Sequence, residues 1–233
     1  MDMARFILFV YLLIYMECYK LKTINVLVGF ECSQIMTEAF LQNKCIAYSC
    51  DIKPCEGKRP KLHFCCDVWN VISSRKWSII VLHPVCTAMA VSGNGTYGTG
   101  KEKHHKRLEA IDYTLALWEH AKKYADVVIL ENPKSVIFPI LRNQGVFIQY
   151  IQPYQFGHPE RKQTGLAIYG LKDPFKPTKD VELEMLRLPE KESNRIWYAG
   201  PSGDRAAIRS ETFPGIAAAI ASQTVKQYRK SKQ

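Results

Sequence analysis

Three patterns that mark common protein classes are missing from this sequence. The longest apolar run, FILFVYLLIY at residues 6–15, is shorter than the roughly 20 residues that a membrane-spanning helix needs. The eight cysteines include no CxxC pair, the usual half of a zinc site. Acidic residues are in the minority, with 22 Asp and Glu against 32 Lys and Arg. These absences argue against a membrane protein, a common zinc module and an acidic protein.

The positive charge is the first feature with a functional meaning. The formal net charge is +10 and the isoelectric point is about 9.2. Lys and Arg gather in KEKHHKR (101–107) and in the tail RKSK (229–232). Such clustering favours a nucleic-acid partner, whereas ordinary basicity would only aid solubility. The hydrophobic fraction of 47% predicts a folded core rather than disorder.

The cysteines favour a reducing compartment. A secreted disulfide scaffold is usually short and loop-rich, but this chain of 233 residues has long apolar strands and helices. A zinc site built from Cys50, Cys55, His63, Cys65 and Cys66 is conceivable, although adjacent Cys65 and Cys66 would point to opposite faces of a strand. We expect free thiols, no metal site and a cytoplasmic location, or the host cytoplasm if the protein is viral.

Residues 1–22 form an apolar N-terminal extension. FILFVYLLIY follows Arg5, like the apolar region of a signal peptide, but the following MECYKLKT has no small-x-small cleavage site. We expect a helix packed on the domain, or an upstream extension with Met16 as a plausible start. No membrane partner is expected.

From Thr23 onward, strand and helix patterns alternate. Apolar runs typical of strands buried on both faces end in turn residues or proline. The expected strands are INVLVG (24–29), CIAYSCD (45–51), KLHFCCD (61–67), WSIIVLHP (77–84), ADVVILENP (125–133), VFIQYIQPY (146–154) and TGLAIYGL (164–171). The last two are close in sequence, which predicts an antiparallel pair. The chain is therefore expected to be α/β, with a doubly wound, mostly parallel seven-stranded sheet and a terminal antiparallel hairpin.

Helices and loops fill the intervals between these strands. Ser33 is expected to cap a helix that reaches about Gln42, and the basic run 101–107 opens a helix that reaches about Tyr124. The glycine-rich loop SGNGTYGTG (92–100) is expected to be mobile. Residues 172–205 hold many Pro and charged residues and are expected to be irregular, and TFPGIAAAIASQTVKQY (212–228) predicts the last helix.

The carboxyl ends of the strands are the expected binding edge, because ligands of doubly wound sheets bind there near the switch in strand order. Gly29 permits a tight turn after the first strand, but no GxGxxG follows it. Asp51, at the end of the second strand, can accept both hydroxyls of a ribose. Asp67, at the end of the third, can meet an adenine amine. These residues suit a nucleoside-type cofactor without a pyrophosphate; alternatively, both aspartates only cap turns or helices.

Six sequence blocks in a fixed order indicate a family. They are ECSQ (31–34), YSCD (48–51), HPVCT (83–87), ENP (131–133), QPYQFGHPE (152–160) followed by KQT (162–164), and RSETFPGIAAAIA (209–221). Over residues 24–225 their order resembles that of the cytosine-C5 DNA methyltransferases. The chain is more similar still to compact phage and prophage proteins described as DNA cytosine methyltransferase-like, whose blocks resemble EFSG, WSCD, HPPCT, ENP, QPWQFGHPE and R-x-x-TYPGIA.

The resemblance implies a class I S-adenosylmethionine-dependent methyltransferase fold, with S-adenosyl-L-methionine as cofactor and DNA as partner. It implies catalytic roles for Cys86, Glu131, Arg161 and Lys162. It places the cofactor against Gly29, Phe30, Glu31, Ser33, Asp51, Ile52, Asp67, Val68 and Pro84.

The chemistry of cytosine accounts for these residue types. C5 is a poor nucleophile until a thiolate adds to C6, and Cys86 follows a strand end on a turn shaped by Pro84. Glu131, at the neighbouring strand end, could hydrogen-bond ring N3 and the exocyclic amine. Lys162, with Arg161 beside it, would face O2. Alternatively, Cys86 is only a small buried hydrophobic residue.

Two departures from the family pattern and one omission bear on activity. Val85 stands where the family has proline, which relaxes the turn, and Gln34 replaces a glycine and could crowd the methionine end of the cofactor. An irregular insert, 172–211, replaces a target-recognition domain between the catalytic domain (23–171) and the C-terminal helix and basic tail (212–233). Loose or partner-directed specificity for a flipped or unpaired cytosine is therefore expected, with loop 92–107 closing over the base.

Two other functions stay open on the sequence alone. One is a catalytically silent nucleic-acid-binding module that keeps the fold. The other is a base-modifying enzyme acting on RNA or free nucleotides, because no residue visibly reads the 2′-position that separates RNA from DNA.

Overall fold

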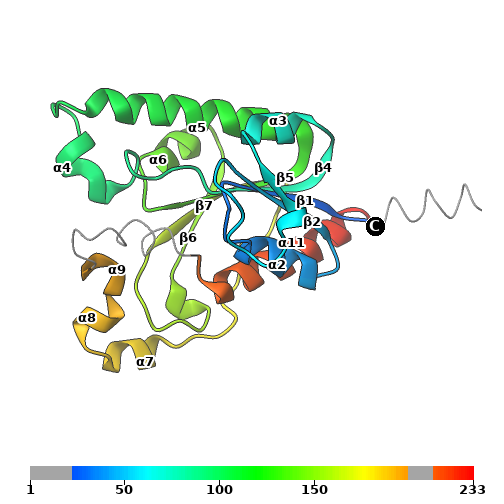
Figure 1. The fold of residues 1–233 in the computed structure, drawn as a ribbon. Helices are drawn as coiled ribbons and strands as arrows, with labels where there is room; N and C mark the ends of the chain where they lie inside the picture. Colours follow the sequence, from blue (N-terminus) through cyan, green and yellow to red (C-terminus); the bar gives the residue numbers. More distant parts are fainter. Residues whose placement is uncertain (1–22, 199–211) are drawn as a thin grey trace, which may run out of the picture.

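The described residues, 23–198 and 212–233 of a computed structural model, contain a seven-stranded sheet with the order β3-β2-β1-β4-β5-β7-β6 (Figure 1). The strands are β1 (Asn25–Gly29), β2 (Ile46–Asp51), β3 (His63–Cys65), β4 (Trp77–Leu82), β5 (Ala125–Pro133), β6 (Phe147–Ile151) and β7 (Thr164–Tyr169). β1 to β5 pair in parallel, and β7 runs antiparallel to both β5 and β6. This arrangement confirms the predicted fold class, including the terminal hairpin. The N-terminal extension lies outside the described residues.

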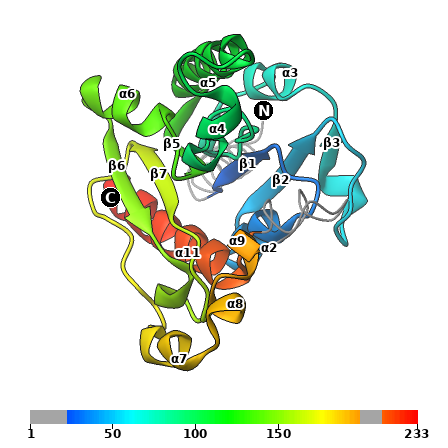
Figure 2. The same cartoon turned by 90° about the vertical axis from the view of Figure 1, so that its left-hand side faces the viewer.

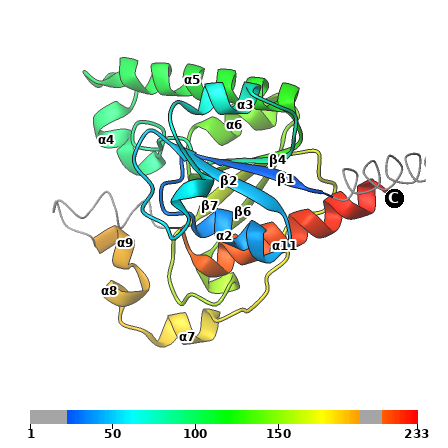
Figure 3. The same cartoon turned by 45° about the vertical axis from the view of Figure 1, so that its right-hand side comes forward.

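Helices cover both faces of the sheet (Figure 3). In chain order the α-helices of the described part are α2 (Ile35–Gln42), α3 (Val68–Ser73), α4 (Asn94–Tyr97), α5 (His104–Tyr124), α6 (Ile137–Asn143), α7 (Glu182–Arg187), α8 (Glu190–Ser193), α9 (Arg195–Tyr198) and α11 (Pro214–Ser231). Helices α2 and α11 cover one face, and α3, α5 and α6 cover the other. The fold is therefore a three-layer α/β/α arrangement.

The continuous apolar strands follow from this double coverage. Val26 and Val28 of β1 pack into the core beneath α2 and α11, whereas Leu27, between them, packs into the core beneath α3 and α5. All three side chains are fully buried. Because successive residues of a strand point to opposite faces, both sets must be apolar, and each such side chain stabilises the fold by about 1.5–3 kcal/mol.

Three expectations about helices and loops are wrong in part. Residues 182–198, expected to be irregular, contain the short helices α7, α8 and α9. The glycine-rich loop contains α4, and the basic run 101–107 enters its helix only at His104. Charge and proline content obscured the three short helices, because a helix of four to six residues carries little periodic signal.

The insert packs on the motif QPYQFGHPE. The backbone N–H of Val181 donates to the carbonyl of Tyr154 (2.8 Å), and the N–H of Arg161 donates to the carbonyl of Ser193 (2.8 Å). Helices α8 and α9 thus lie beside the loop that leads into β7, on the same side of the molecule as α4 (Figure 2).

Candidate active site

The sequence motifs meet at the carboxyl edge of the sheet because the parallel strands end in register. Gly29 of β1 pairs with Cys50 of β2 and with Leu82 of β4, and Leu82 pairs with Leu130 of β5. The residues that follow these positions therefore emerge side by side. Figure 2 looks onto this edge, with α4 above it and α9 below.

The turn that carries Cys86 is held at both of its ends. The side-chain amide of Asn132 donates to the carbonyl of Pro84 (2.9 Å), which ties the start of the turn to the residue after Glu131. The carbonyl of Cys86 accepts from the N–H groups of Met89 (3.0 Å) and Ala90 (2.7 Å). Cys86 is half-buried, so its thiol is not simply part of the core. Val85, in place of proline, has 69% of its surface exposed and forms no part of this bracing.

Arg107 braces the same segment from α5. Its guanidinium donates to the carbonyls of Ala88 (2.7 Å) and Ala90 (3.3 Å) and to the side chain of Asn94 (2.8 Å). Arg107 is only 6% exposed, whereas Lys106 beside it is exposed. The basic run 101–107 thus contains both exposed cations and one buried cation that supports the structure. In the sequence, Arg107 cannot be told apart from the exposed cations beside it.

The residues GNGTYG (93–98) match the GxGxxG pattern of dinucleotide-binding loops, but their structure is not that of such a loop. It forms the end of a 3₁₀ turn and helix α4, rather than a turn between a strand and a helix of the sheet. Asn94, the first residue of α4, is the one held by Arg107. The loop expected to be mobile is therefore attached to α5 through a buried charge.

Glu131 is paired with His83, a residue that the sequence analysis did not single out. Oε2 of Glu131 lies 2.9 Å from Nδ1 of His83, and both side chains are largely buried. Burial alone would raise the pKa of Glu131, but the hydrogen bond and charge of His83, with Lys162 nearby, lower that pKa below its ordinary value. Burial alone would lower the pKa of His83, but its bond to Glu131 and the charges of Glu131 and Glu31 raise that pKa. Both shifts favour the charged forms of the pair, an imidazolium and a carboxylate.

Lys162 reaches this pair from the loop before β7. Its charge acts on both His83 and Glu131, and its backbone N–H donates to the side chain of Gln152 (3.1 Å). Its ammonium lies 5.6 Å from the ring centre of Phe213. Arg161, by contrast, is exposed and contacts the insert through its backbone. Lys162 is thus brought to the site, and Arg161 faces outward.

Two motifs far apart in the sequence meet beside Lys162. Nε2 of His158 accepts from the N–H of Gly215 (2.9 Å), and the His158 ring lies 5.1 Å from that of Phe213. A Cβ on Gly215 would lie 2.0 Å from the carbonyl oxygen of Phe156. Glycine is therefore required at the start of α11 because the loop 156–160 passes directly over it.

The loop between β1 and α2 turns sharply, and its residues differ from expectation. Phe30 and Gln34 both have φ of 62°, an uncommon conformation for residues with a side chain. The prediction that Ser33 caps this helix is wrong. Gln34 occupies the N-cap position, and the carboxylate of Glu31 accepts from the N–H groups of Met36 (2.6 Å) and Thr37 (3.2 Å). A carboxylate at this position also complements the helix dipole.

Gln34 turns away from the strand ends and into the region between β2 and β3. Its side-chain amide donates to the hydroxyl of Ser49 (3.0 Å) and to the carbonyl of Arg59 (2.9 Å), and its oxygen accepts from the N–H of Arg59 (2.8 Å). Ser49 also lies 2.9 Å from Nδ1 of His63. The Gln34 side chain therefore fastens the segment between β2 and β3, and no local pattern in the sequence indicates these partners.

The proposed cofactor contacts lie along the ends of β1, β2 and β3. Asp51 accepts from the N–H of Lys53 (2.9 Å), and Ile52 beside it is 78% exposed. Asp67 caps α3 through the N–H of Trp69 (3.0 Å), while Val68 is buried. Both aspartates therefore cap a turn or a helix, as the alternative interpretation of the sequence expected, and the exposed Ile52 leaves an apolar side chain beside the Asp51 carboxylate.

Gly29 has a packing role of its own. A Cβ there would lie 2.7 Å from Val68 and 2.9 Å from Leu82. The glycine therefore lets α3 and β4 approach the end of β1, in addition to permitting the turn that follows.

The cysteines of the described residues carry no disulfide and form no cluster for a metal. Cys32, Cys45, Cys50, Cys55, Cys65, Cys66 and Cys86 are free thiols. Burial raises the pKa of Cys50 to about 12, so this thiol is unreactive near neutral pH. Within residues 23–198 and 212–233, no three His, Cys, Asp or Glu side chains gather as metal ligands. None of the helices in these ranges is long and apolar enough to cross a bilayer.

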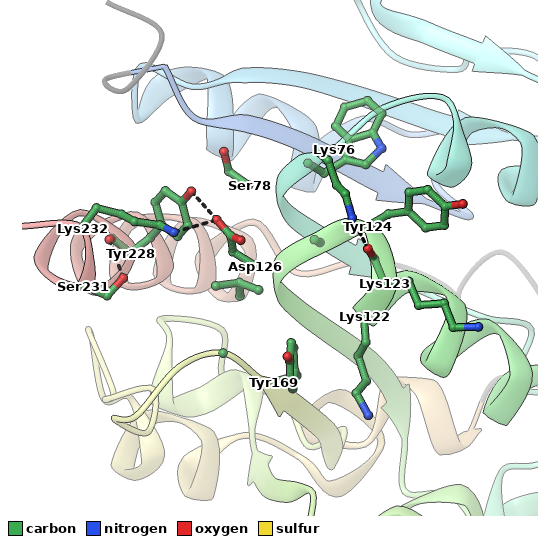
Figure 4. A pocket seen from close by; sticks show the side chains of 14 residues that line it. Lys76, Ser78, Lys122, Lys123, Tyr124, Asp126, Tyr169, Tyr228, Ser231 and Lys232 are labelled. Atoms are coloured by element: carbon green, nitrogen blue, oxygen red, sulfur yellow. Dashed lines mark hydrogen bonds and ion pairs between the residues drawn. The ribbon is translucent and has the colours of Figure 1, made fainter. Parts of the chain in front are cut away.

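A hollow of about 670 Å³ lies at the opposite edge of the sheet, where β4 and β5 begin and α11 ends (Figure 4). Two of its lysines form ion pairs: Lys232 pairs with Asp126 (3.0 Å), and Lys122 pairs with Glu119 (2.8 Å). None of the predicted site residues lines it. The hollow is separate from the motif-bearing edge.

Comparisons with known proteins add little beyond the fold. No protein-family model and no curated protein matches the chain. Among solved structures, the Entamoeba histolytica methyltransferase EhMeth matches with 15% identity and a TM-score of 0.45, over 68% of this chain and 58% of that one. A complex of WbdD with the kinase inhibitor LY294002 matches with 12% identity and a TM-score of 0.41, over 65% and 37% of the two chains. The chain thus spans about 37–58% of the length of these structures.

Proposed function

We propose that this protein is an S-adenosylmethionine-dependent methyltransferase that transfers a methyl group to C5 of cytosine in DNA through a covalent adduct of Cys86. One observation carries the proposal. Three groups that the chemistry requires converge on one edge of the sheet: the Cys86 turn, the Glu131 carboxylate tied to it through His83 and Asn132, and the Lys162 ammonium. They come from three separate motifs, so their convergence is a property of the fold.

Each side chain has a defined task in this mechanism. The Cys86 thiolate bonds to C6 of a flipped cytosine, which makes C5 nucleophilic. Glu131 hydrogen-bonds N3 and the exocyclic amine, and Lys162 stabilises the negative charge that develops on the ring at O2. When bound, S-adenosylmethionine supplies an electrophilic methyl group. The C5 proton then leaves to water, its bonding pair re-forms the C5=C6 bond, and the C6–S pair returns to Cys86 as the thiolate.

The cofactor assignment rests on the ends of β1, β2 and β3. Asp51 would accept the ribose hydroxyls, with Ile52 against the adenine, and the sharp loop that contains Phe30 would face the methionine end. Gln34 supports this arrangement, because its side chain is committed to Ser49 and Arg59 rather than to the space beyond β1.

The decisive test uses DNA that contains 5-fluorocytosine, because fluorine at C5 cannot leave as a proton and the adduct is trapped. With S-adenosylmethionine, the wild-type protein should form a complex that survives denaturing electrophoresis, and Cys86→Ala should not. Cys55→Ala, which changes another half-buried thiol, is the matched control and should trap normally. Methyl transfer that persists in Cys86→Ala would refute the C5 mechanism.

A second candidate, a silent nucleic-acid-binding module, is favoured by the exposed cations near α5. Lys101, Lys103 and Lys106 are exposed beside the carboxyl edge. Salt-dependent DNA binding without cofactor binding, trapping or transfer would support this second function.

A further inference from the structure

His83 has one hydrogen bond and one buried nitrogen that has none. Its Nδ1 lies 2.9 Å from Oε2 of Glu131, while its Nε2 is buried without a hydrogen-bond partner. The main chain is fixed, because the N–H of His83 donates to the carbonyl of Gly29 (3.1 Å). A buried polar atom without a partner costs about 1–3 kcal/mol, so it calls for a functional explanation.

The charges around the imidazole come from three elements. Glu131 belongs to β5, Glu31 to the loop after β1, and Lys162 to the loop before β7. Burial raises the pKa of Glu31, whereas the pKa of Glu131 is lowered, so Glu131 is the carboxylate that most favours the protonated imidazole. The carboxylate oxygens of Glu31 accept hydrogen bonds from the first N–H groups of α2 and from the hydroxyl of Thr37. Glu131 is therefore the direct partner of the imidazolium.

We infer that His83 is the proton store for Glu131, supplying the proton that Glu131 delivers to N3 of the target cytosine. The inference rests on the proposed function and deepens it. The side chain of His83 has a single hydrogen bond, so the proton on Nδ1 is held by the Glu131 carboxylate alone. It can therefore move when charge develops on the other side of that carboxylate.

The transfer balances as follows. The Cys86 thiolate pair forms the bond to C6, the C5=C6 pair moves to C4=C5, and the C4=N3 pair moves onto N3. The proton passes from Nδ1 of His83 to the carboxylate of Glu131 and from that carboxyl group to N3. His83 is left neutral and Glu131 ionised. When Cys86 departs, N3 returns the proton by the same route.

The first test needs no activity. Nuclear magnetic resonance of ring-labelled histidine, assigned by the signal missing in His83→Asn, should give a pKa for His83 above the ordinary 6.5. Glu131→Gln should bring it below 6.5. His120 is an internal control: its Nε2 is also buried without a partner, but burial and Lys123 lower its pKa, so it should titrate below 6.5 in both proteins. A wild-type His83 pKa at or below 6.5 would overturn the inference.

The second test separates a proton store from a residue that only orients Glu131. The nitrogen of the Asn amide can take the place of Nδ1, so His83→Asn keeps a donor to Glu131 but cannot release a proton. The wild-type rate of a single turnover should fall tenfold per pH unit above the His83 pKa. In His83→Asn this alkaline limb should disappear, and the plateau rate should drop at least tenfold. His120→Asn should keep the limb.

The outcomes distinguish this inference from the proposed function. If the wild-type protein transfers methyl groups through Cys86 but His83→Asn keeps the alkaline limb, His83 only positions Glu131 and the proton store is refuted, while the proposed function stands. If the wild-type protein neither traps nor transfers, both are refuted.

Discussion

Replacement of Arg107 provides a direct test of how the Cys86 turn is built. Arg107→Ala removes three hydrogen bonds and leaves the carbonyl of half-buried Ala88 without this donor, whereas the carbonyl of Ala90 keeps the N–H of Gly93 (2.9 Å). One acceptor left unpaired costs about 1–3 kcal/mol, so we expect a loss of about 2 kcal/mol in the free energy of unfolding. For a chain of this size that corresponds to a fall in Tm of roughly 4–8 °C.

The matched control is the neighbouring cation. Lys106→Ala removes the same charge from the exposed face of α5 and should change the free energy of unfolding by less than about 0.5 kcal/mol. Arg107→Lys should recover only part of the loss, because one ammonium cannot replace the three divergent donors of a guanidinium.

Urea unfolding followed by circular dichroism measures all three variants. The slope against urea should be the same for each, so that shifts in midpoint report stability. If Arg107→Ala and Lys106→Ala lie within 0.5 kcal/mol of each other, Arg107 is a surface cation like its neighbours and the bracing argument is wrong. If the bracing argument is right, Arg107→Ala should also trap 5-fluorocytosine more slowly than Lys106→Ala, since the turn that presents Cys86 has lost its support.

Three further predictions follow from the packing, the ion pair and the strand ends. Gly215→Ala places a Cβ 2.0 Å from the carbonyl oxygen of Phe156 and should lower the free energy of unfolding by about 1–3 kcal/mol. Gly95→Ala, whose Cβ would have no atom within 4 Å, is the control and should be neutral or stabilising. Equal melting temperatures for the two variants would contradict the close approach at Gly215. The raised pKa of His83 contributes stability that is present below pH 6.5 and lost as the pH rises through the folded value, and the lowered pKa of Glu131 contributes stability that is present above pH 4.5 and lost as the pH falls through the folded value. Urea titrations should therefore find the stability advantage of wild type over Glu131→Gln to be largest between pH 4.5 and 6.5, and a constant advantage across pH would argue against an ion pair. S-adenosylmethionine should raise the melting temperature, because a ligand at a hundredfold excess over its Kd stabilises the folded state by about 2.7 kcal/mol. Asp51→Ala should weaken this effect, since it removes a hydrogen-bonding partner of the ribose. No shift at millimolar ligand would count against the cofactor.

The sequence by itself determined the sheet. Apolar runs such as 24–29 and 125–133 record burial on both faces, and each run ends where its strand leaves the core. Burial on both faces leaves a continuous local pattern, which can be read without knowing what covers the strand. The close spacing of the last two runs likewise predicted the antiparallel hairpin. Once the sheet is doubly wound, its carboxyl edge follows, and so does the expectation that HPVCT, ENP and KQT lie there.

The partners of individual side chains were decided only in the tertiary structure. Glu31 caps α2 although Ser33 had the better local signal, because the sharp turn at Phe30 brings the longer carboxylate under the first N–H groups of the helix. Gln34 bonds to residues 15 and 25 positions away.

The pairing of His83 with Glu131 spans 48 residues, and Arg107 reaches back 19 residues to Ala88. His83 carried a weak signal, a histidine directly after an apolar strand, but nothing in the sequence named its partner. Contacts of this kind depend on how strand ends and loops are brought together, and such distant pairings leave no periodic trace in the sequence. The sequence thus specified which edge of the sheet holds the site, and the tertiary structure specified the charges, caps and hydrogen bonds that shape it.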